Sequence, residues 1–340
     1  MSSLKLSVDV ERLEFSAPFR IAGFVFEHQD AILVTIEGEG LRGRGEACGV
    51  YYLNDTVARM VEAVEAQRAA IEAGIDRATL QQLMPPGGAR NAVDCALWEL
   101  EARRTGKPVW ELAGLDAPKP LVTTFTLGAD SPTVMVEGAR RYAEARALKL
   151  KLTGDFALDI ARVQAVRDAR PDAWIGVDAN QGYSSAQLGP LIEELGKLKV
   201  AQIEQPLARG HEAELEGINS HIPLVADESA LCFTDLAGLV GRFDMVNIKL
   251  DKCGGLTEGM AMAREAHRLG LEVMVGNMMG TSLAMAPSFV VGQLCDVVDL
   301  DGPTFLRCDR TPGVTYSQGM IWVDEAVWGR PSRTYGAVGF

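Results

Sequence analysis

The sequence predicts an α/β protein, built as a (β/α)8 TIM-type barrel with an N-terminal α+β capping domain that the C-terminal tail completes. The chain has 340 residues, which is long for one ordinary domain but suits a barrel of about 250 residues and a smaller partner. From position 121 onward, short apolar segments alternate with stretches of helical periodicity. Polar residues collect where these segments end, as they do at the mouth of a barrel.

The first part of the chain mixes two periodicities. The opening segment MSSLKLSVDVERLEF and residues 31–37 alternate apolar and polar side chains, which predicts strands. Residues 55–74 and 89–105 carry apolar residues at helical spacing, which predicts helices. We therefore assign residues 1–118 to an α+β capping domain, which also serves as a lid.

Eight apolar segments follow at intervals of about 22 to 27 residues. They read LVTTFTLG, ALKLKLTG, WIGVDAN, VAQIEQP, PLVADES, MVNIKLDK, EVMVGN and VVDLDGP. Strands that alternate with helices pair in parallel through right-handed crossovers, and eight of them suffice to close a barrel. An open doubly wound sheet is the alternative. Against it, no early segment of this series is followed by G-x-G-x-x-G, and polar residues gather at many strand ends.

We assign residues 119–311 to the barrel domain. Beyond it, residues 320–323 predict one more short strand, and the rest of the tail is rich in Gly, Arg and Pro. We expect residues 312–340 to pack back on the capping domain.

Composition and charge exclude several classes of protein. Hydrophobic residues make up 47% of the chain, and no apolar run approaches the roughly 20 residues that a membrane span needs. A net charge of −13 argues against nucleic-acid binding, which needs concentrated Lys and Arg. The first residues lack the pattern of a secretory signal, and the six cysteines are scattered without a C-x-x-C pair. We expect a soluble, cytoplasmic homo-oligomer with reduced thiols.

Three carboxylates end successive predicted strands: Asp178 the third, Glu204 the fourth and Asp227 the fifth. Together at one barrel mouth they would raise each other's pKa unless a cation neutralised them. Hard oxygen ligands with room for water suit Mg2+ better than Zn2+. The alternative, in which each acid caps the helix after its strand, explains one acid more readily than three in succession. We predict a Mg2+ site.

Lysines lie on both sides of these acids. Lys149 and Lys151 are two apart on the second strand, so their side chains leave the same face, the barrel interior. Lys249 is on the sixth strand, across the barrel. Repulsion between the first two ammonium groups, together with a nearby Mg2+, should lower the pKa of at least one and make it a usable base. A solvated charge is the alternative for any one lysine taken alone.

Acids and lysines so placed suit the removal of a proton next to a carboxylate, with a base on each face of the carbon. The strand-end motifs K-x-K, D-x-N, E-Q-P, D-E-S and N-I-K occur here in order. With GGARNAVDCALWELEARRTGKPVWEL and NIKLDKCGGLTEG, they resemble the muconate-cycloisomerase-like subgroup of the enolase superfamily over nearly the whole chain. That superfamily uses a Lys or His base with one or two Mg2+ ions.

Within that subgroup, Asp299 and Asp301 in DLDGP resemble the doublet with which dipeptide epimerases bind the α-ammonium group of a dipeptide. An Asp-Gly turn that closes the last strand is the alternative. The resemblance implies an isomerase, a Mg2+-dependent dipeptide epimerase that inverts the α-carbon of the second residue of an L-X-Xaa dipeptide. L-Ala-D/L-Glu, from peptidoglycan peptide recycling, is the best-known substrate of that group.

The resemblance also implies roles for individual residues. Lys151 and Lys249 are the two acid/base groups, while Lys149 tunes Lys151 and helps to neutralise the substrate carboxylate. The metal ligands are Asp178, Glu204 and Asp227.

Two aromatic segments should lie over the barrel mouth as lids. FRIAGFVFEHQ carries Phe24 and Phe26, and VYYLND carries Tyr51 and Tyr52. We place Phe24 and Tyr51 among the substrate-binding residues, and the alternative is packing within the capping domain. Related enzymes that act on a Glu side chain can place an arginine in the first segment, which here has only Arg20. A more hydrophobic dipeptide is therefore a second expectation.

Other outcomes are compatible with the same fold and metal. Cycloisomerisation, o-succinylbenzoate synthesis and acid-sugar dehydration begin at a similar enolate, but the doublet of Asp299 and Asp301 argues against them. Mandelate-racemase-like members would supply a histidine from the seventh strand, and EVMVGNMMGTS has none. A non-catalytic barrel that binds a metal or small ligand is the remaining alternative, and the retained lysines and acids weigh against it.

Overall fold

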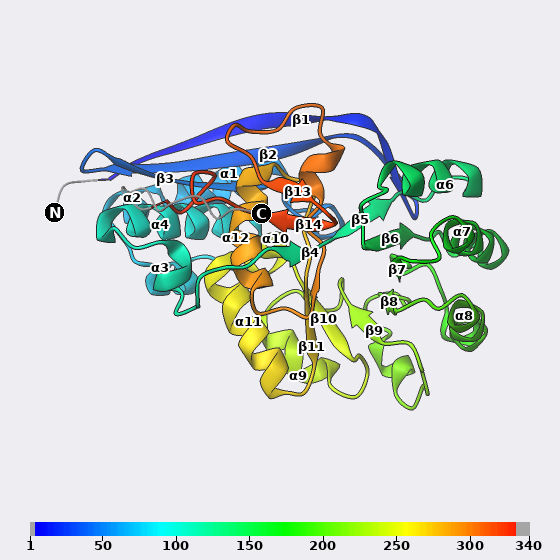
Figure 1. The fold of residues 1–340 in the computed structure, drawn as a ribbon. Helices are drawn as coiled ribbons and strands as arrows, with labels where there is room; N and C mark the ends of the chain where they lie inside the picture. The colour runs from blue at the N-terminus through cyan, green and yellow to red at the C-terminus, as the bar shows by residue number, and fades with distance from the viewer. Residues whose placement is uncertain (1–3, 331–340) are drawn as a thin grey trace.

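The computed structural model describes residues 4–330, and Figure 1 shows two parts side by side. In one part, long antiparallel strands and the helices α1 to α4 form the capping domain. In the other, eight parallel strands curl into a barrel with helices outside it. The predicted α/β barrel with an α+β capping domain is confirmed.

The capping domain contains an antiparallel sheet in the order β1-β2-β3. Its strands are β1 (Lys5–Ile21), β2 (Phe24–Gly38) and β3 (Leu41–Ala47). Its helical elements are η1 (Tyr51–Leu53), α1 (Val57–Ala66), α2 (Arg68–Glu72), α3 (Arg77–Leu83), α4 (Gly88–Thr105) and α5 (Val109–Leu112). The strand predicted at 31–37 lies in β2, and the two predicted helical stretches contain α1 with α2, and α4.

Strand β3 and helix α4 pack with their backbones in contact. A Cβ built at Gly45 would lie 2.0 Å from Ala92 O, and one built at Gly43 would lie 2.0 Å from Ala96 O. Only glycine permits so close an approach, because any side chain would displace the helix. The two glycines therefore seat the sheet on α4, whose residues 88–100 are all buried.

All eight predicted apolar segments form the barrel strands, in the order β12-β11-β10-β9-β8-β7-β6-β5. They are β5 (Thr124–Leu127), β6 (Ala147–Lys151), β7 (Trp174–Asp178), β8 (Gln202–Glu204), β9 (Leu224–Ala226), β10 (Met245–Ile248), β11 (Glu272–Val275) and β12 (Val297–Val298). Every pair in this series is parallel. Their carboxyl ends consequently meet at one mouth.

The helices around the barrel are less regular than the sequence suggests. Long helices follow only some strands: α6 (Pro132–Arg141), α7 (Phe156–Ala169), α8 (Ser185–Lys197), α11 (Leu256–Arg268) and α12 (Ser282–Gly292). Shorter elements fill the other connections: η2 (Glu212–Leu215), η3 (Phe233–Asp235), α9 (Leu236–Leu239), α10 (Leu250–Cys253) and η4 (Gly302–Phe305). The predicted alternation of strands with stretches of helical periodicity gives no long helix after β8, β9 and β12, where loops and short helical turns follow the strand instead.

The barrel is closed by side chains between its first and last strands. Thr124 Oγ1 donates to Asp299 Oδ1 at 2.5 Å, and Thr126 N donates to Asp301 Oδ2 at 2.6 Å. Leu300 N donates to Thr123 Oγ1 at 2.9 Å. The acidic doublet of the last strand thus joins β12 to β5 where a backbone ladder is missing.

The segment after the barrel returns to the capping domain. Strands β13 (Thr315–Ser317) and β14 (Met320–Trp322) form an antiparallel sheet with β4 (Leu121–Val122). Beyond them, Trp328 Nε1 donates to Arg44 O at 2.9 Å, and Arg44 Nη2 donates to Val327 O at 2.8 Å. The described part of the predicted tail, 312–330, therefore contacts β3, while 331–340 lies outside the described residues.

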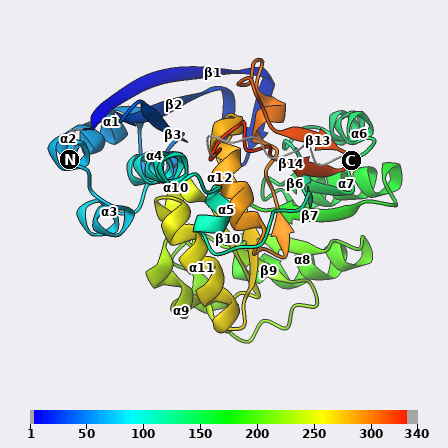
Figure 2. The ribbon, with the colours of Figure 1, turned by 60° about the vertical axis from the view of Figure 1, so that its left-hand side comes forward.

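Alternation along β6 divides apolar from charged residues. Leu148, Leu150 and Leu152 are buried in the main hydrophobic core, while Lys149 and Lys151 point from the opposite face. Figures 1 and 2 show β1 running from the capping domain across the rim of the barrel toward α6. The capping domain therefore covers the face toward which the lysines point.

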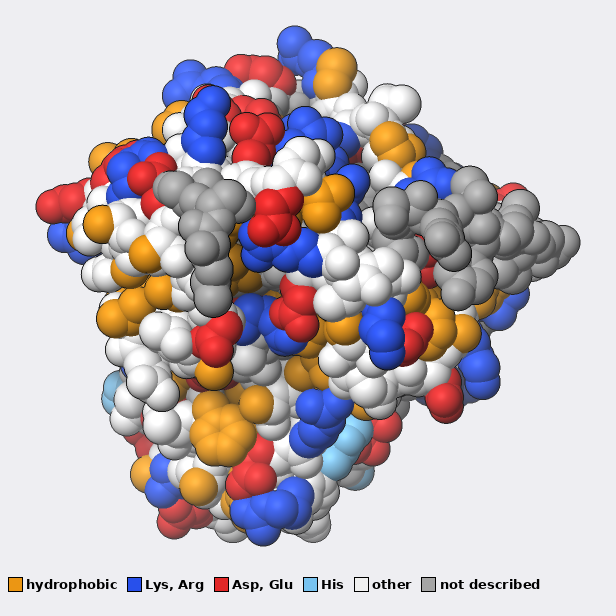
Figure 3. Space-filling model, turned by 90° about the vertical axis from the view of Figure 1, so that its left-hand side faces the viewer, with side chains coloured by type: hydrophobic (Ala, Val, Ile, Leu, Met, Phe, Trp, Pro, Cys, Tyr) orange, Lys and Arg blue, Asp and Glu red, His pale blue; other side chains and the backbone are white. Residues whose placement is uncertain are grey.

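The surface carries charges of both signs. On the face drawn in Figure 3, acidic and basic side chains are interspersed, so the net charge of −13 is not gathered there into one patch. Within residues 4–330, no helix has the length and apolar character needed to cross a membrane. All six cysteines are unpaired, three of them buried.

Adding a single methyl group at Gly45 tests whether close packing of β3 on α4 stabilises the protein. Gly45→Ala should lower the free energy of unfolding by on the order of 1–3 kcal/mol, because the new Cβ overlaps Ala92 O. Gly238→Ala is the matched control, since a Cβ there meets no atom within 4 Å, and should change stability by less than about 0.5 kcal/mol. Urea unfolding measures both. Equal stability of the two variants would contradict this account of the packing.

Asp251 on α10 joins the barrel to the capping domain and should make stability depend on pH. Its Oδ1 accepts hydrogen bonds from Cys48 N and Gly49 N, at 2.8 and 3.3 Å. Burial, with nearby Asp55 and Glu46, raises its pKa to about 7 from an ordinary 3.8. The folded protein therefore binds the proton more tightly, and this contribution to stability is lost as pH rises from about 4 through 7.

Asp251→Asn keeps an oxygen acceptor without a titrating proton, so its stability should fall less steeply over that pH range. The free energy of unfolding, measured at pH 4, 5.5 and 7 for both proteins, tests this. Parallel pH profiles would show that Asp251 does not titrate in this window.

Candidate active site

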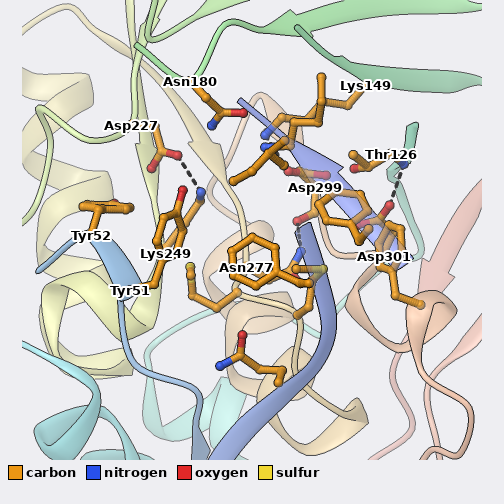
Figure 4. Close-up of a pocket in the computed structure, with 18 of the residues that line it drawn as sticks. Tyr51, Tyr52, Thr126, Lys149, Asn180, Asp227, Lys249, Asn277, Asp299 and Asp301 are labelled. Carbon is orange, nitrogen blue, oxygen red and sulfur yellow. Dashed lines mark hydrogen bonds and ion pairs between the residues drawn. The ribbon is translucent and has the colours of Figure 1, made fainter. Parts of the chain in front are cut away.

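A cavity lies at the carboxyl ends of the barrel strands, beneath the capping domain, with a volume of about 650 Å3 including the part open to solvent. Figure 4 shows Asp227, Lys249 and Tyr52 on one side of it and Thr126, Asp299 and Asp301 on the other. The capping domain supplies Phe19, Ile21, Phe26, Gln29, Tyr51 and Tyr52. The barrel supplies Thr126, Lys149, Lys151, Asn180, Asp227, Glu228, Lys249, Asn277, Met278, Met279, Asp299, Asp301 and Phe305.

The three predicted metal ligands converge at this mouth. Asp178 and Glu204 are the last residues of β7 and β8 and are paired in register, and Asp227 directly follows β9. Each side chain offers an oxygen, and these oxygens all lie within 4.8 Å of one another. All three residues are buried, with at most 1% of their surface exposed.

The electrostatics of the cluster favour a bound cation. Burial, then the charges of Asp178 and Asp227, raise the pKa of Glu204 to about 7. Nearby buried oxygens also lack partners, because Asn180 Oδ1 and Glu228 Oε2 accept no hydrogen bond in the part of the chain that the structure describes. A hard divalent cation with bound water would satisfy both the repulsion and the unpartnered oxygens, so the residues present fit Mg2+.

Each of the three predicted lysines contacts an acid of the cavity. Lys151 Nζ lies 2.5 Å from Asp178 Oδ2 and Lys249 Nζ lies 2.5 Å from Asp227 Oδ2. Lys149 Nζ lies between Glu204 Oε2 and Asp299 Oδ2, at 2.7 and 2.9 Å. Because β6 and β10 are four strands apart in the barrel order, Lys151 and Lys249 enter the cavity from different sides.

The sequence predicts a lowered pKa for at least one of the two β6 lysines beside Mg2+, and Lys149, among its carboxylates, does not have a lowered pKa. Burial lowers the pKa of Lys149, but Asp299, Glu204 and Asp178 together outweigh it and raise that pKa well above its usual range. The sequence showed Lys151 as the nearest charge, whereas the folded protein surrounds Lys149 with carboxylates. A cation bound by those carboxylates would act in the opposite direction.

A fourth lysine, not singled out from the sequence, completes the cluster. Lys252 is fully buried on α10 and donates to Asp227 Oδ1 and Asp227 O, each at 2.6 Å, and to Asn247 O at 2.9 Å. Burial lowers the pKa of Lys252, and Lys249 contributes to that shift. Its position three residues after Lys249, within NIKLDK, was the available signal. Asp227 is therefore fixed through both carboxylate oxygens.

The acidic doublet faces the cavity beside Lys149. Asp299 Oδ2 accepts from Lys149 Nζ while its other oxygen accepts from Thr124 Oγ1. Burial, then the charge of Asp299, raise the pKa of Asp301 to about 7. Both residues line the cavity, so the predicted turn and the predicted binding doublet are compatible: the pair closes the barrel and still faces the space inside it.

The aromatic lid residues do not all reach the cavity. Phe26, Tyr51 and Tyr52 line it, and the ring centroids of Tyr51 and Phe26 are 5.4 Å apart. Phe24 is 49% exposed, is absent from the lining, and packs on Tyr51 with a centroid distance of 4.9 Å. Arg20 is also outside the lining and pairs with Asp130 at 3.2 Å. The sequence missed several apolar lining residues, among them Phe19, Met278, Met279 and Phe305.

Two family descriptions together match most of the chain. The family "Mandelate racemase / muconate lactonizing enzyme, N-terminal domain" matches residues 5–114, and "Enolase C-terminal domain-like" matches residues 134–326. The chain belongs to the enolase superfamily.

Several relatives of this enolase superfamily member are named as dipeptide epimerases or as similar to them. It is 37% identical to the L-Ala-D/L-Glu epimerase of Escherichia coli K12 over 304 residues, which cover 89% of this chain and 95% of the relative. A crystal structure of an Agrobacterium tumefaciens enolase family member with homology to dipeptide epimerases, bound to sodium and L-Ala-L-Glu, superposes with a TM-score of 0.93. It is 40% identical, over 96% of this chain and 100% of the other.

A third match is more distant. The dipeptide epimerase of Enterococcus faecalis V583, complexed with Mg and L-Leu-L-Tyr, superposes with a TM-score of 0.86 at 28% identity. The match covers 92% of this superfamily member and 94% of the other chain.

Mg2+ should stabilise the protein through the three acids. Excess Mg2+, at about 100 times its Kd, should add about 2.7 kcal/mol to the free energy of unfolding. Glu204→Gln removes one charge with little change of shape and should abolish most of that gain. Glu194→Gln, at a partly exposed acid on α8 that pairs with Lys197, is the control and should retain the gain. Thermal unfolding with Mg2+ and with EDTA measures both, and a full Mg2+ response in Glu204→Gln would place the metal elsewhere.

Proposed function

We propose that this chain is a Mg2+-dependent dipeptide epimerase that performs a 1,1-proton transfer at the α-carbon of the C-terminal residue of an L-X-Xaa dipeptide. The carrying observation is the placement of Lys151 and Lys249. They come from strands four apart and reach one cavity, each beside a different acid of the carboxylate cluster. A carbon held between them has an acid/base group on each face, which is the requirement for inversion.

The lysines would divide the proton transfer between them. With one lysine neutral and the other charged, the neutral amine removes the α-proton from its face and the ammonium group delivers a proton to the opposite face. The resulting protonation states are suited to the reverse direction, so both configurations are substrates. Lys149, buried beside Glu204 and Asp299, would keep positive charge next to the substrate carboxylate.

Asp178, Glu204 and Asp227 are proposed as the metal ligands. When bound there, Mg2+ would act as a Lewis acid that stabilises negative charge on the substrate carboxylate as the proton leaves. Lys252 Nζ donates to Asp227 Oδ1 at 2.6 Å, and Asn247 Nδ2 donates to Glu204 Oε1 at 2.9 Å. These hydrogen bonds orient the side chains of Asp227 and Glu204 before the metal ion binds.

Asp299 and Asp301 are proposed to bind the α-ammonium group of the dipeptide. Two buried carboxylates facing the cavity are suited to a cation, and charge-assisted hydrogen bonds to them would orient the substrate. This feature favours a dipeptide over the substrates of cycloisomerases, o-succinylbenzoate synthases and acid-sugar dehydratases. Tyr51 is proposed to cover the bound peptide, whereas Phe24 packs on Tyr51 and Phe26 from outside the cavity.

The proposed substrate is L-Ala-D/L-Glu or a more hydrophobic dipeptide. The name of the Escherichia coli relative supports L-Ala-D/L-Glu, and the L-Leu-L-Tyr bound to the Enterococcus faecalis enzyme supports a hydrophobic dipeptide. We further propose a cytoplasmic homo-oligomer that acts in peptidoglycan peptide recycling. The six unpaired cysteines support a reducing compartment.

Deuterium exchange tests the reaction directly. In D2O with Mg2+, a library of L-X-Xaa dipeptides should show epimerisation, with deuterium entering only the α-position of the second residue, as followed by NMR. N-acetylated forms of the same dipeptides lack the cation that the acidic doublet would bind, and should lose at least about tenfold in kcat/KM. Exchange in the N-acetylated compounds but in no free dipeptide would favour an N-acyl amino acid racemase instead.

Single lysine variants test the two-base arrangement. Lys151→Ala and Lys249→Ala should each reduce epimerisation by at least 10^3-fold, on the scale of general acid–base catalysis. Each variant should still exchange the α-proton of one enantiomer through its remaining lysine, with opposite enantiomers in the two variants. Full epimerisation by either variant would exclude the mechanism.

A further inference from the structure

A second cavity lies directly behind one wall of the proposed active site. It has a volume of about 1330 Å3, is open to solvent, and lies between the end of β1 and helix α6. Phe19, Thr126 and Phe305 line both cavities, so these three residues lie between them. The rings of Phe19 and Phe305 meet edge to face, with centroids 4.8 Å apart and planes at 63°. We call these two residues the Phe19–Phe305 partition.

The partition is held in place from two sides. The pairing of β1 with β2 is interrupted between Glu14 and Phe19, and there β1 bonds to the loop after the barrel instead. Arg307 N donates to Glu14 O at 2.8 Å, and Ser16 Oγ donates to Phe305 O at 2.9 Å. These two hydrogen bonds tie the backbone of β1 to the segment that carries Phe305, and so hold the two rings next to each other.

Past the partition, β1 is also bound to the barrel. Ala129 N, in the loop after β5, donates to Arg20 O at 2.8 Å. Phe19 itself is only 8% exposed and packs among Leu13, Phe15 and Leu306. Displacing either ring would therefore break packing contacts. The binding of a large substrate side chain would have to offset the free energy lost in this way.

The partition lies next to the carboxylate proposed to bind the substrate's amino end. Thr126 N donates to Asp301 Oδ2 at 2.6 Å, and Figure 4 shows these two residues joined at one end of the cavity. Asp301 is the N-cap residue of η4, and Phe305 is the last residue of that short helix. In a dipeptide, the first α-carbon is one bond of about 1.5 Å from the ammonium nitrogen. The side chain of the first residue would therefore begin beside the partition.

The second residue would lie at the other end. Its α-carbon is about 3.8 Å further along the peptide and must reach the space between Lys151 and Lys249. Figure 4 shows Tyr51 and Tyr52 beside Lys249, so the side chain of the second residue would face these two rings. The partition is thus placed to act on the first side chain and not on the second.

We propose, on the basis of the epimerase function above, that the Phe19–Phe305 partition sets the upper size of the first residue's side chain. Dipeptides whose first residue is as small as alanine fit in front of the partition. A larger side chain would collide with it, although the second cavity behind offers space. Removing one ring should join the two cavities and admit the larger side chain.

The test compares substrates that differ only in the first residue. The second residue is the one that the wild-type protein epimerises fastest in the dipeptide library, and the first is L-Ala, L-Leu or L-Phe. The wild-type protein should prefer L-Ala over L-Leu by at least about tenfold in kcat/KM. Phe305→Ala should raise kcat/KM for the L-Leu and L-Phe dipeptides at least about tenfold, so that the preference narrows or reverses. The ratio of kcat/KM between the L-Ala and L-Leu dipeptides separates the two explanations. A relieved size limit changes this ratio, whereas a disrupted active site lowers kcat/KM for all substrates.

Matched variants complete the design. Phe305→Leu keeps a bulky apolar side chain and should stay close to the wild-type ratio. Val134→Ala changes a residue on α6 that lines only the second cavity, and should leave the ratio unchanged. Phe19→Ala opens the partition from its other side and should act like Phe305→Ala, which provides a second variant if one fails to fold.

The outcomes separate this inference from the proposed function. If the wild-type protein epimerises L-Ala dipeptides but the ratio is unchanged in the folded Phe19→Ala or Phe305→Ala variant, the size limit is excluded and the epimerase stands. Equal wild-type activity on L-Ala and L-Leu dipeptides also excludes it. If the wild-type protein acts on no dipeptide, the proposed function and this inference both fail.

Discussion

Burial of many opposite charges in one cavity is the constraint on which the rest of this structure depends. Within the described residues, six buried carboxyl groups and four buried lysines lie at or just beneath the barrel mouth: Asp178, Glu204, Asp227, Glu228, Asp299, Asp301, Lys149, Lys151, Lys249 and Lys252. An unpaired charge there would cost several kcal/mol, so every lysine contacts a carboxylate. Six carboxylates against four lysines leave two negative charges when all are ionised, which is the charge that a divalent cation would neutralise.

The same charged groups also hold the barrel together. Asp299 uses one oxygen to accept from Thr124 of the first strand and the other to accept from Lys149 of the second. Asp301 accepts a hydrogen bond from the backbone of Thr126. This contact joins β12 to β5, which have no backbone hydrogen bonds between them. Closure of the barrel and arrangement of the proposed ammonium site therefore depend on the same two side chains. A change at either position would affect both fold and chemistry.

The capping domain is bonded to the barrel loops at several buried points. Asp251 accepts from the backbone of Cys48 and Gly49, and Thr281 N donates to Glu46 Oε1 at 2.7 Å. These contacts hold the end of β3 over the cavity, and η1 with its tyrosines follows directly. These polar contacts to the barrel position Tyr51 and Tyr52 over the cavity. The rings of Phe26, Tyr51 and Tyr52 then pack against one another along its aromatic wall.

The sequence by itself determined the eight barrel strands, the three acids and the three lysines. Strand periodicity places alternate residues on one face, and parallel order brings all strand ends to one mouth, so local patterns were sufficient. Only the tertiary structure decided which charges touch. It placed Lys149 among carboxylates, brought Thr124 to Asp299 across 175 residues, buried Lys252 beneath Asp227, and set Phe19 against Phe305 while leaving Phe24 outside. These contacts depend on how distant segments pack, and local sequence patterns do not specify that.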